Sequence, residues 1–280
     1  LAVYRYWNII QYYFPYKHLI EEDWKLVLKE FIPTFLAAKN DMDYSLRCLE
    51  IIGRVHDSHA SIWGKNEALD VFWGVNYAPI EVTFIENKAV VTDFHDAELG
   101  KQTGLEIGDV ITAINNQSVD EMVKARLIHT PASNYPTQLR NIAGNLLCTN
   151  DSTMNIKFIR NDQSESRTVS VYSPDNMQIS SIFEDPDTSF RLFQGGIAYI
   201  NHGELKVADL DEIWKAIEPT KGLIIDIRNY PSDFPIYELS ALLMPKKTPF
   251  VKFSKGSLEY PGLFTYTKPL TVGKRKNKES

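Results

Sequence analysis

Hydrophobic residues recur every three or four positions through residues 1–53, as they do along one face of an α-helix. Pro15 ends a first stripe, and the acidic run 21–23 precedes a second, where negative charge favours a helix N-terminus. Asp43 and Gly53 are suited to cap the two ends of a third helix. The stripes contain Val3, Trp7, Ile10 and Phe14, then Trp24, Val27, Leu28, Phe31 and Phe35, then Leu46, Leu49 and Ile52. We expect a small helical bundle with these residues in its core rather than around a ligand groove.

Through residues 55–63 the pattern repeats at every second position, so that apolar and polar side chains alternate. Alternation predicts a β-strand, and it places Asp57, His59 and Ser61 on one face of that strand. The segment lies between the helical bundle and a β-rich part of the chain.

Residues 71–173 combine short β-rich runs with turn residues and form a domain of their own. Strands are expected at 80–85, 88–94, 110–114, 154–158 and 168–172, with turns at 86–87, 115–116 and 161–162. Ser118 and Glu121 have the spacing of a capping box at the start of one helix, and Pro136 opens another that runs to Leu146.

Residues 176–280 change to an alternation of strand and helix. Strands are expected at 196–200 and 222–227, with helices at 210–217 and 237–244. The second strand is uninterruptedly apolar, which is typical of a strand buried on both faces of a parallel sheet. This order predicts a right-handed α/β crossover. The charged run 274–280 is expected to be a linker or loop.

Composition narrows the function classes. Hydrophobic residues make up 44% and charged residues 24% of the 280 residues, which is ordinary for a globular protein. The formal net charge of −6 argues against nucleic acid as the main partner. No apolar run approaches the roughly 18 residues of a membrane span. Cys48 and Cys148 lack metal-ligand spacing and are expected to be buried thiols, with a disulfide between them as the alternative.

The segment GLEIGDVITAINNQSV at 104–119 resembles the signature of a PDZ domain of the bacterial protease type, in which two glycines permit a tight turn before a strand that ends in a hairpin. Such domains bind an extended peptide by adding it to a sheet edge, with backbone amides holding the terminal carboxylate. The resemblance implies a peptide or protein C-terminus as the partner. We expect Gly74 and Val75, within the segment 72–75, to belong to the carboxylate-binding loop.

The chain has, in order, a helical bundle, a strand with Asp-Ser-His, a PDZ-like domain and then Asp226–Asn229. This order is similar to the domain order of the C-terminal-processing, tricorn-core-like serine peptidases. The resemblance implies an α+β multidomain protein with a partial α/β core of crotonase-like architecture. Its parts are a helical domain (1–66), a PDZ-like domain (71–173) and an incomplete peptidase core (176–280). It also implies an extracytoplasmic location, and it indicates no cofactor.

The tricorn-like branch of that family places a Ser-His pair just after the helical bundle, where this chain has Ser58 and His59. By resemblance His59 is the general base and Ser58 a supporting group, since a serine nucleophile needs an imidazole to take its proton. A metal site of His56, Asp57 and His59 is the alternative. It is disfavoured because the two histidines would point to opposite faces of a strand.

The resemblance weakens at the turn after the apolar strand. The family has a glycine-rich turn there whose amides supply part of the oxyanion hole, whereas this chain continues as Tyr-Pro-Ser-Asp at 230–233. Proline has no N–H, and Ser232 or Asp233 would crowd a substrate more than glycine. We expect Asp226 and Arg228 to form an ion pair that fixes this turn rather than to act in catalysis.

No serine between Lys247 and Ser280 stands at a strand-to-helix turn, where the family carries its nucleophile. We therefore expect that this chain alone does not hydrolyse peptides and does not react stoichiometrically with a fluorophosphonate. An incomplete core would expose a sheet edge and an apolar face, which predicts self-association. The hypotheses are a truncated serine endopeptidase, a PDZ peptide-binding protein and, more weakly, a pseudo-enzyme.

Overall fold

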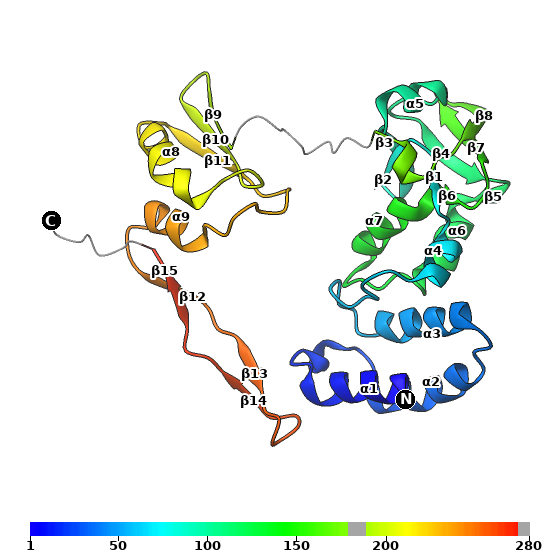
Figure 1. The fold of residues 1–280 in the computed structure, drawn as a ribbon, viewed down its shortest axis with the longest axis horizontal. Coiled ribbons are helices and arrows are strands. Elements are labelled where there is room, and N and C mark those ends of the chain that lie inside the picture. Colours follow the sequence, from blue (N-terminus) through cyan, green and yellow to red (C-terminus); the bar gives the residue numbers. More distant parts are fainter. Residues whose placement is uncertain (179–188, 274–280) are drawn as a thin grey trace. The chain divides into compact units, whose positions relative to one another are not determined.

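The computed structural model describes residues 1–178 and 189–273 (Figure 1). The chain divides into two compact units, Leu1–Ser180 and Ser181–Ser280. The first unit contains two separate hydrophobic cores, one among the N-terminal helices and one under the large sheet. We call these parts the helical region and the sheet region. The expected division of the first unit into two domains stays a prediction.

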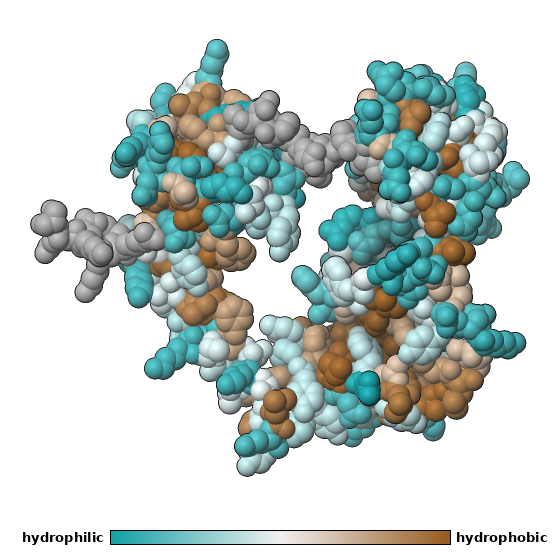
Figure 2. Space-filling view, in the orientation of Figure 1, coloured by the Kyte–Doolittle hydropathy of each residue, from teal (hydrophilic) through white to brown (hydrophobic). Residues whose placement is uncertain are grey.

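The helical region has the three predicted helices. They are α1 (Ala2–Tyr13), α2 (Trp24–Leu36) and α3 (Asp41–Gly53), with a short 3-10 turn at Lys17–Leu19. Trp7 and Trp24 join α1 to α2, because each indole N–H donates to the backbone carbonyl of the other residue, at 2.7 and 3.1 Å. Trp24 is 3% exposed and lies in the core, as predicted. Figure 2 shows further hydrophobic atoms gathered on the surface over these helices.

The caps of α3 differ from the prediction. Asn40 is the N-cap rather than Asp43, because the Asn40 side chain accepts the backbone N–H of Asp43. Gly53 is the last helical residue, and Arg54 follows it in helical geometry. Arg54 pairs with Glu22 and Glu30, which ties the end of α3 to α2 and the turn before it.

The predicted strand at 55–63 was wrong. Instead, the side chain of Asp57 accepts the backbone N–H of His59, and the backbone carbonyl of Asp57 accepts the N–H of Ala60. His56 takes the left-handed conformation with φ of 54°. A carboxylate that bonds its own backbone two residues ahead stabilises a turn, and this local bonding outweighs the alternating pattern. Helix α4 (Glu67–Trp73), capped by Asn66, follows the turn.

The sheet region has β-strands and two-residue turns where the sequence pattern predicted them. An antiparallel sheet has the order β2 (Glu81–Ile85), β3 (Lys88–Asp93), β4 (Val110–Ile114), β7 (Thr153–Arg160), β8 (Gln163–Ser170), with β5 (Gln117–Ser118) paired to β4. The three two-residue turns at 86–87, 115–116 and 161–162 all have positive φ at both residues. That geometry matches the twist of the strands that the turns join. A separate pair, β1 (Asn76–Tyr77) and β6 (Cys148–Thr149), lies at the end of the region.

Helices cover the core of the sheet region. They are α5 (Ala97–Gln102), α6 (Val119–Leu127) and α7 (Tyr135–Leu146), followed by a 3-10 turn at Pro174–Asn176. The predicted capping box between Ser118 and Glu121 is present at the start of α6. Helix α7 packs against β2 and α6 against β4, so α7 lies beside the edge strand of the sheet.

The second unit has the predicted strand–helix–strand order. Strand β10 (Ile197–Asn201) runs parallel to β11 (Gly222–Asp226), and β9 (Phe190–Phe193) pairs with the other side of β10. Helices α8 (Leu210–Ile217), preceded by the 3-10 turn Val207–Asp209, and α9 (Ile236–Leu243) pack on this sheet. Two antiparallel strand pairs follow. Strand β12 (Thr248–Val251) pairs with β15 (Leu270–Val272), and β13 (Ser254–Gly256) pairs with β14 (Phe264–Tyr266).

The expectation that β11 is buried on both faces was wrong. It is the last strand in the order β11-β10-β9 of the described residues, and Ile224 at its centre is 50% exposed. An apolar run predicts burial only where other elements cover both faces of the strand. Self-association through this unit stays a prediction, and the expected linker at 274–280 lies outside the described residues.

Both cysteines are free, so the alternative of a disulfide was wrong. Cys148 is buried and Cys48 half-buried. Within residues 1–178 and 189–273, no helix combines the length and the apolar character needed to cross a bilayer.

Candidate functional site

The turn after α3 presents His59 to solvent. The backbone N–H of His59 donates to Asp57 Oδ1 at 2.8 Å, and His59 Nδ1 lies 3.9 Å from the same oxygen. That second distance is too long for a direct hydrogen bond but close enough for the carboxylate to favour one orientation of the ring. The His59 side chain is 97% exposed, so its Nε2 is accessible. This geometry leaves the imidazole able to exchange a proton with a bound molecule.

Ser58 joins the turn to the sheet region. Its Oγ lies 2.8 Å from Ser133 Oγ and accepts the backbone N–H of Ser133 at 3.0 Å. The two serines stand 75 residues apart in the chain, and Ser133 lies just before α7. Ser58 therefore holds the His59 turn against the segment that begins α7. Its catalytic support of His59 stays a prediction.

A cavity of about 370 Å³ adjoins the turn. Its lining is apolar at Phe14, Leu19 and Val55 and polar at residues 56–59 and Ser133. A hollow of this size accepts one or two side chains of a peptide. His59 thus lies beside a space that a substrate could fill.

The reason given against metal binding does not hold, because His56 and His59 lie in a turn and not on opposite faces of a strand. Over the described part of the chain, no three His, Cys, Asp or Glu side chains gather closely enough to hold an ion.

Strand β2 offers an open edge for an added strand. Val91 on β3 directs its N–H to Asp109 O and its carbonyl to Gly108 N–H, both at 2.9 Å and both away from β2. Antiparallel pairs alternate between bonded and non-bonded partners. Val82, which faces Val91, and Phe84, two residues on, therefore direct their backbone groups away from β3, toward the edge.

The predicted carboxylate loop at 72–75 is partly helical. Phe72 and Trp73 end α4, and the N–H of Gly74 donates to Asp70 O, so this amide is already used. Gly74 has φ of 102°, and a Cβ there would lie 2.4 Å from the backbone N of Thr149. Glycine is required at this close approach of two backbones. Binding of a carboxylate by Val75, which is 45% exposed, stays a prediction.

The second unit contains the other group of predicted site residues. The Arg228 guanidinium contacts both carboxylate oxygens of Asp226, the shortest contact being 2.5 Å, and Tyr199 Oη donates to Asp226 Oδ2 at 2.8 Å. These hydrogen bonds hold the pKa of Asp226 well below its usual range, with Arg228 as the largest cause. The bond to Asp226 raises the pKa of Tyr199. The expected ion pair is therefore present.

Ser232 and Asp233 are engaged with backbone. Ser232 Oγ donates to Leu205 O at 3.1 Å, and Asp233 Oδ2 accepts the N–H of Val207 at 3.0 Å. Hydrogen bonds from Val207 and then Phe234 lower the pKa of Asp233. Both side chains fix the turn against the loop before α8, and a role in an oxyanion hole stays a prediction.

Comparisons with known proteins give structural likenesses only. No family model and no curated protein matches the sequence. The chain is similar to a photosystem II D1 C-terminal processing protease with a TM-score of 0.39 and 11% identity, covering 96% of this chain and 69% of that one. It is similar to the PDZ domain of EpsC from Vibrio cholerae with a TM-score of 0.22 and 17% identity, covering 37% of this chain and 84% of that one. It is also similar to an S41 protease from Bacteroides fragilis with a TM-score of 0.22 and 13% identity, covering 61% of this chain and 46% of that one. At these TM-scores the likenesses carry no argument about this chain.

Three features of the site were not predicted from the sequence. Helix α4 had a usable signal, since Asn66 precedes residues at helical spacing that include Leu69 and Trp73. The contact of Ser133 with Ser58 and the open edge of β2 had none, because both depend on which distant segments become neighbours.

Proposed function

We propose that this chain belongs to a serine peptidase of the C-terminal-processing type, and that its sheet region binds an extended peptide along β2. One observation carries the proposal. The edge strand has the outward-directed backbone groups of Val82 and Phe84, and helix α7 packs beside it. Strand addition needs an unpaired edge, and a neighbouring helix can supply contacts for alternate side chains. The PDZ-like signature at 104–119 supports the same function.

The proposed role of His59 is that of general base. Its support is the Asp-Ser-His sequence after the helical bundle, the exposure of the ring and the adjoining cavity. Because Ser58 bonds the segment before α7, the turn and the peptide-binding helix are physically connected. The family resemblance further implies an extracytoplasmic location for this activity.

A binding function without chemistry is the second candidate. It is favoured by the turn at 229–233, where Pro231 has no N–H and the side chains of Ser232 and Asp233 are already bonded to the protein. Both candidates require the peptide to bind at β2.

Titration with an extended, apolar peptide, followed by ¹H–¹⁵N NMR, tests the binding. The amides of Val82 and Phe84 should shift downfield and gain protection from exchange, since they would donate to the peptide. The amides of Thr83 and Ile85, already directed to β3, serve as internal controls and should change little. A C-terminally amidated peptide measures whether the carboxylate is recognised. Saturable binding that leaves Val82 and Phe84 unprotected would refute strand addition.

His59→Ala tests the chemistry in a form of the protein that turns over peptide. Loss of a general base lowers turnover by about 10²-fold or more. His18→Ala changes an exposed histidine that does not line this cavity, so it is the control and should retain turnover. Equal rates for wild type and His59→Ala, with peptide binding intact, would favour the binding-only candidate or another base.

A further inference from the structure

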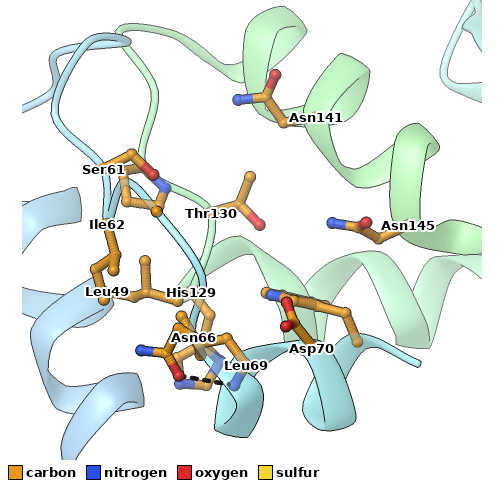
Figure 3. A pocket seen from close by; sticks show the side chains of 13 residues that line it. Leu49, Ser61, Ile62, Asn66, Leu69, Asp70, His129, Thr130, Asn141 and Asn145 are labelled. Atoms are coloured by element: carbon orange, nitrogen blue, oxygen red, sulfur yellow. Dashed lines mark hydrogen bonds between the residues drawn. The ribbon is translucent and has the colours of Figure 1, made fainter. Parts of the chain in front are cut away.

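A second cavity, of about 340 Å³, lies in the first unit between the segment from α3 to α4 and one face of α7 (Figure 3). Its apolar lining includes Leu49, Ile62, Leu69 and Pro131. Figure 3 shows the side chains of Asp70, Thr130, Asn141 and Asn145 directed into the same space. The cavity therefore combines an apolar side with several groups able to form hydrogen bonds.

The Asp70 carboxylate is the charged group of this cavity. Within residues 1–178 and 189–273 it has no hydrogen-bond or ion-pair partner, and none of the lining residues is a lysine or arginine. Arg126 lies nearby but is used elsewhere, since it donates to the carbonyl of Asn145 at 2.8 Å and stacks over Trp73. The cavity thus presents a carboxylate whose charge the protein leaves unpaired.

His129 lines the same cavity and is held in place by Glu50. Nε2 of His129 lies 3.0 Å from Glu50 Oε1, and a carboxylate only accepts, so Nε2 carries the proton. Nδ1 is buried with no hydrogen-bond partner among the described residues. Because Nδ1 is enclosed by the protein, the Asp70 carboxylate remains the charged acceptor that a ligand in the cavity can reach.

We propose that this cavity binds a guanidinium or ammonium group on an alkyl stem. A guanidinium offers five N–H donors in a planar fork, which suits a carboxylate together with neighbouring amide oxygens. The alkyl stem would contact Leu49 and Ile62, as the stems of long basic side chains contact apolar surfaces. The group can come from a free amine or from an arginine or lysine side chain of a peptide. This site uses α4 and α7 and does not depend on binding at β2.

Titration of the whole chain with agmatine, an alkyl guanidinium without a carboxylate, tests the proposal by ¹H–¹⁵N NMR. Saturable shifts are expected at Asp70 and at the side-chain amides of Asn141 and Asn145. Asp70→Asn keeps the shape and removes the charge, and it should weaken binding by about tenfold or more. Glu67→Gln makes the same change of charge on the same helix outside the cavity and should leave affinity within about twofold.

Two further ligands distinguish the sources. Tighter binding of N-acetyl-arginine amide than of agmatine indicates a peptide side chain, and the reverse indicates a free amine. N-butylurea lacks both positive charges of agmatine, and it should bind much more weakly because it loses the attraction to the Asp70 carboxylate. Equal affinity for butylurea and agmatine overturns the proposal. So does equal agmatine affinity of wild type and a folded Asp70→Asn, or no saturable shift at millimolar agmatine.

Discussion

Arg160, the last residue of β7, binds the loop before β4 through its whole guanidinium. Nε and Nη2 donate to the two oxygens of Asp109 at 2.8 and 2.6 Å, and the group also contacts Glu106 Oε1 and Gly104 O. Asp109 is 2% exposed. Burial alone would raise the pKa of Asp109, but the hydrogen bonds from Arg160 and from Glu106 N–H outweigh it and hold this pKa below its usual range.

Arg160→Met keeps most of the aliphatic volume and leaves the Asp109 carboxylate buried without its partner. Removing one member of a buried ion pair costs about 3–5 kcal/mol. Because the Arg160 side chain is 19% exposed, water can replace part of what it supplies. We therefore expect a loss at the lower end, about 3 kcal/mol in the free energy of unfolding of the sheet region.

Hydrogen exchange by mass spectrometry on peptides that cover β4 and β7 measures this loss without interference from the second unit. Arg167→Met is the matched control. Arg160 and Arg167 both stack over the ring of Phe158, but Arg167 pairs with Glu165 nearer the surface, where the two side chains are 44% and 30% exposed. Exposed pairs contribute less than about 1 kcal/mol. Equal changes for the two variants would refute the reasoning.

The pH dependence gives an independent check. The folded pKa of Asp109 is lower than the unfolded value of about 3.9, so its stabilisation is complete above that pH. It is lost as the pH falls through the folded pKa. The difference in stability between wild type and Arg160→Met should therefore narrow as the pH falls below about 4. A difference that stays constant down to pH 2 would contradict the assignment.

Further predictions concern single groups. Arg228→Gln should raise the pKa of Asp226 toward about 3.9, as measured by ¹³C NMR of the carboxyl group, since its main hydrogen-bond donor is lost. Gly74→Ala should lower the free energy of unfolding by more than about 2 kcal/mol, whereas Gly64→Ala, with positive φ but open space around it, should cost about 1 kcal/mol. Burial raises the pKa of Cys148 to about 12, so iodoacetamide at pH 8 should leave this thiol unmodified until the protein unfolds; rapid labelling would contradict it.

Features that depend on neighbouring residues were predictable from the sequence. The three N-terminal helices, the two-residue turns with positive φ and the capping box at Ser118 appear where the pattern placed them. Each is decided within a few residues, by side-chain periodicity, by turn conformations that asparagine and aspartate adopt readily, or by a cap three residues away. The strand–helix–strand order of the second unit was predictable for the same reason.

The tertiary structure decided what the local pattern could not. The alternating residues 55–63 form a turn, because Asp57 bonds its own backbone and Ser58 bonds Ser133, 75 residues away. The apolar β11 is half-exposed, because burial depends on which elements cover it. The open edge of β2 and the Asp70 cavity likewise arise from segments far apart in the chain. Sequence alone thus determined most of the elements and the identities of their reactive side chains, whereas packing determined which of those side chains meet.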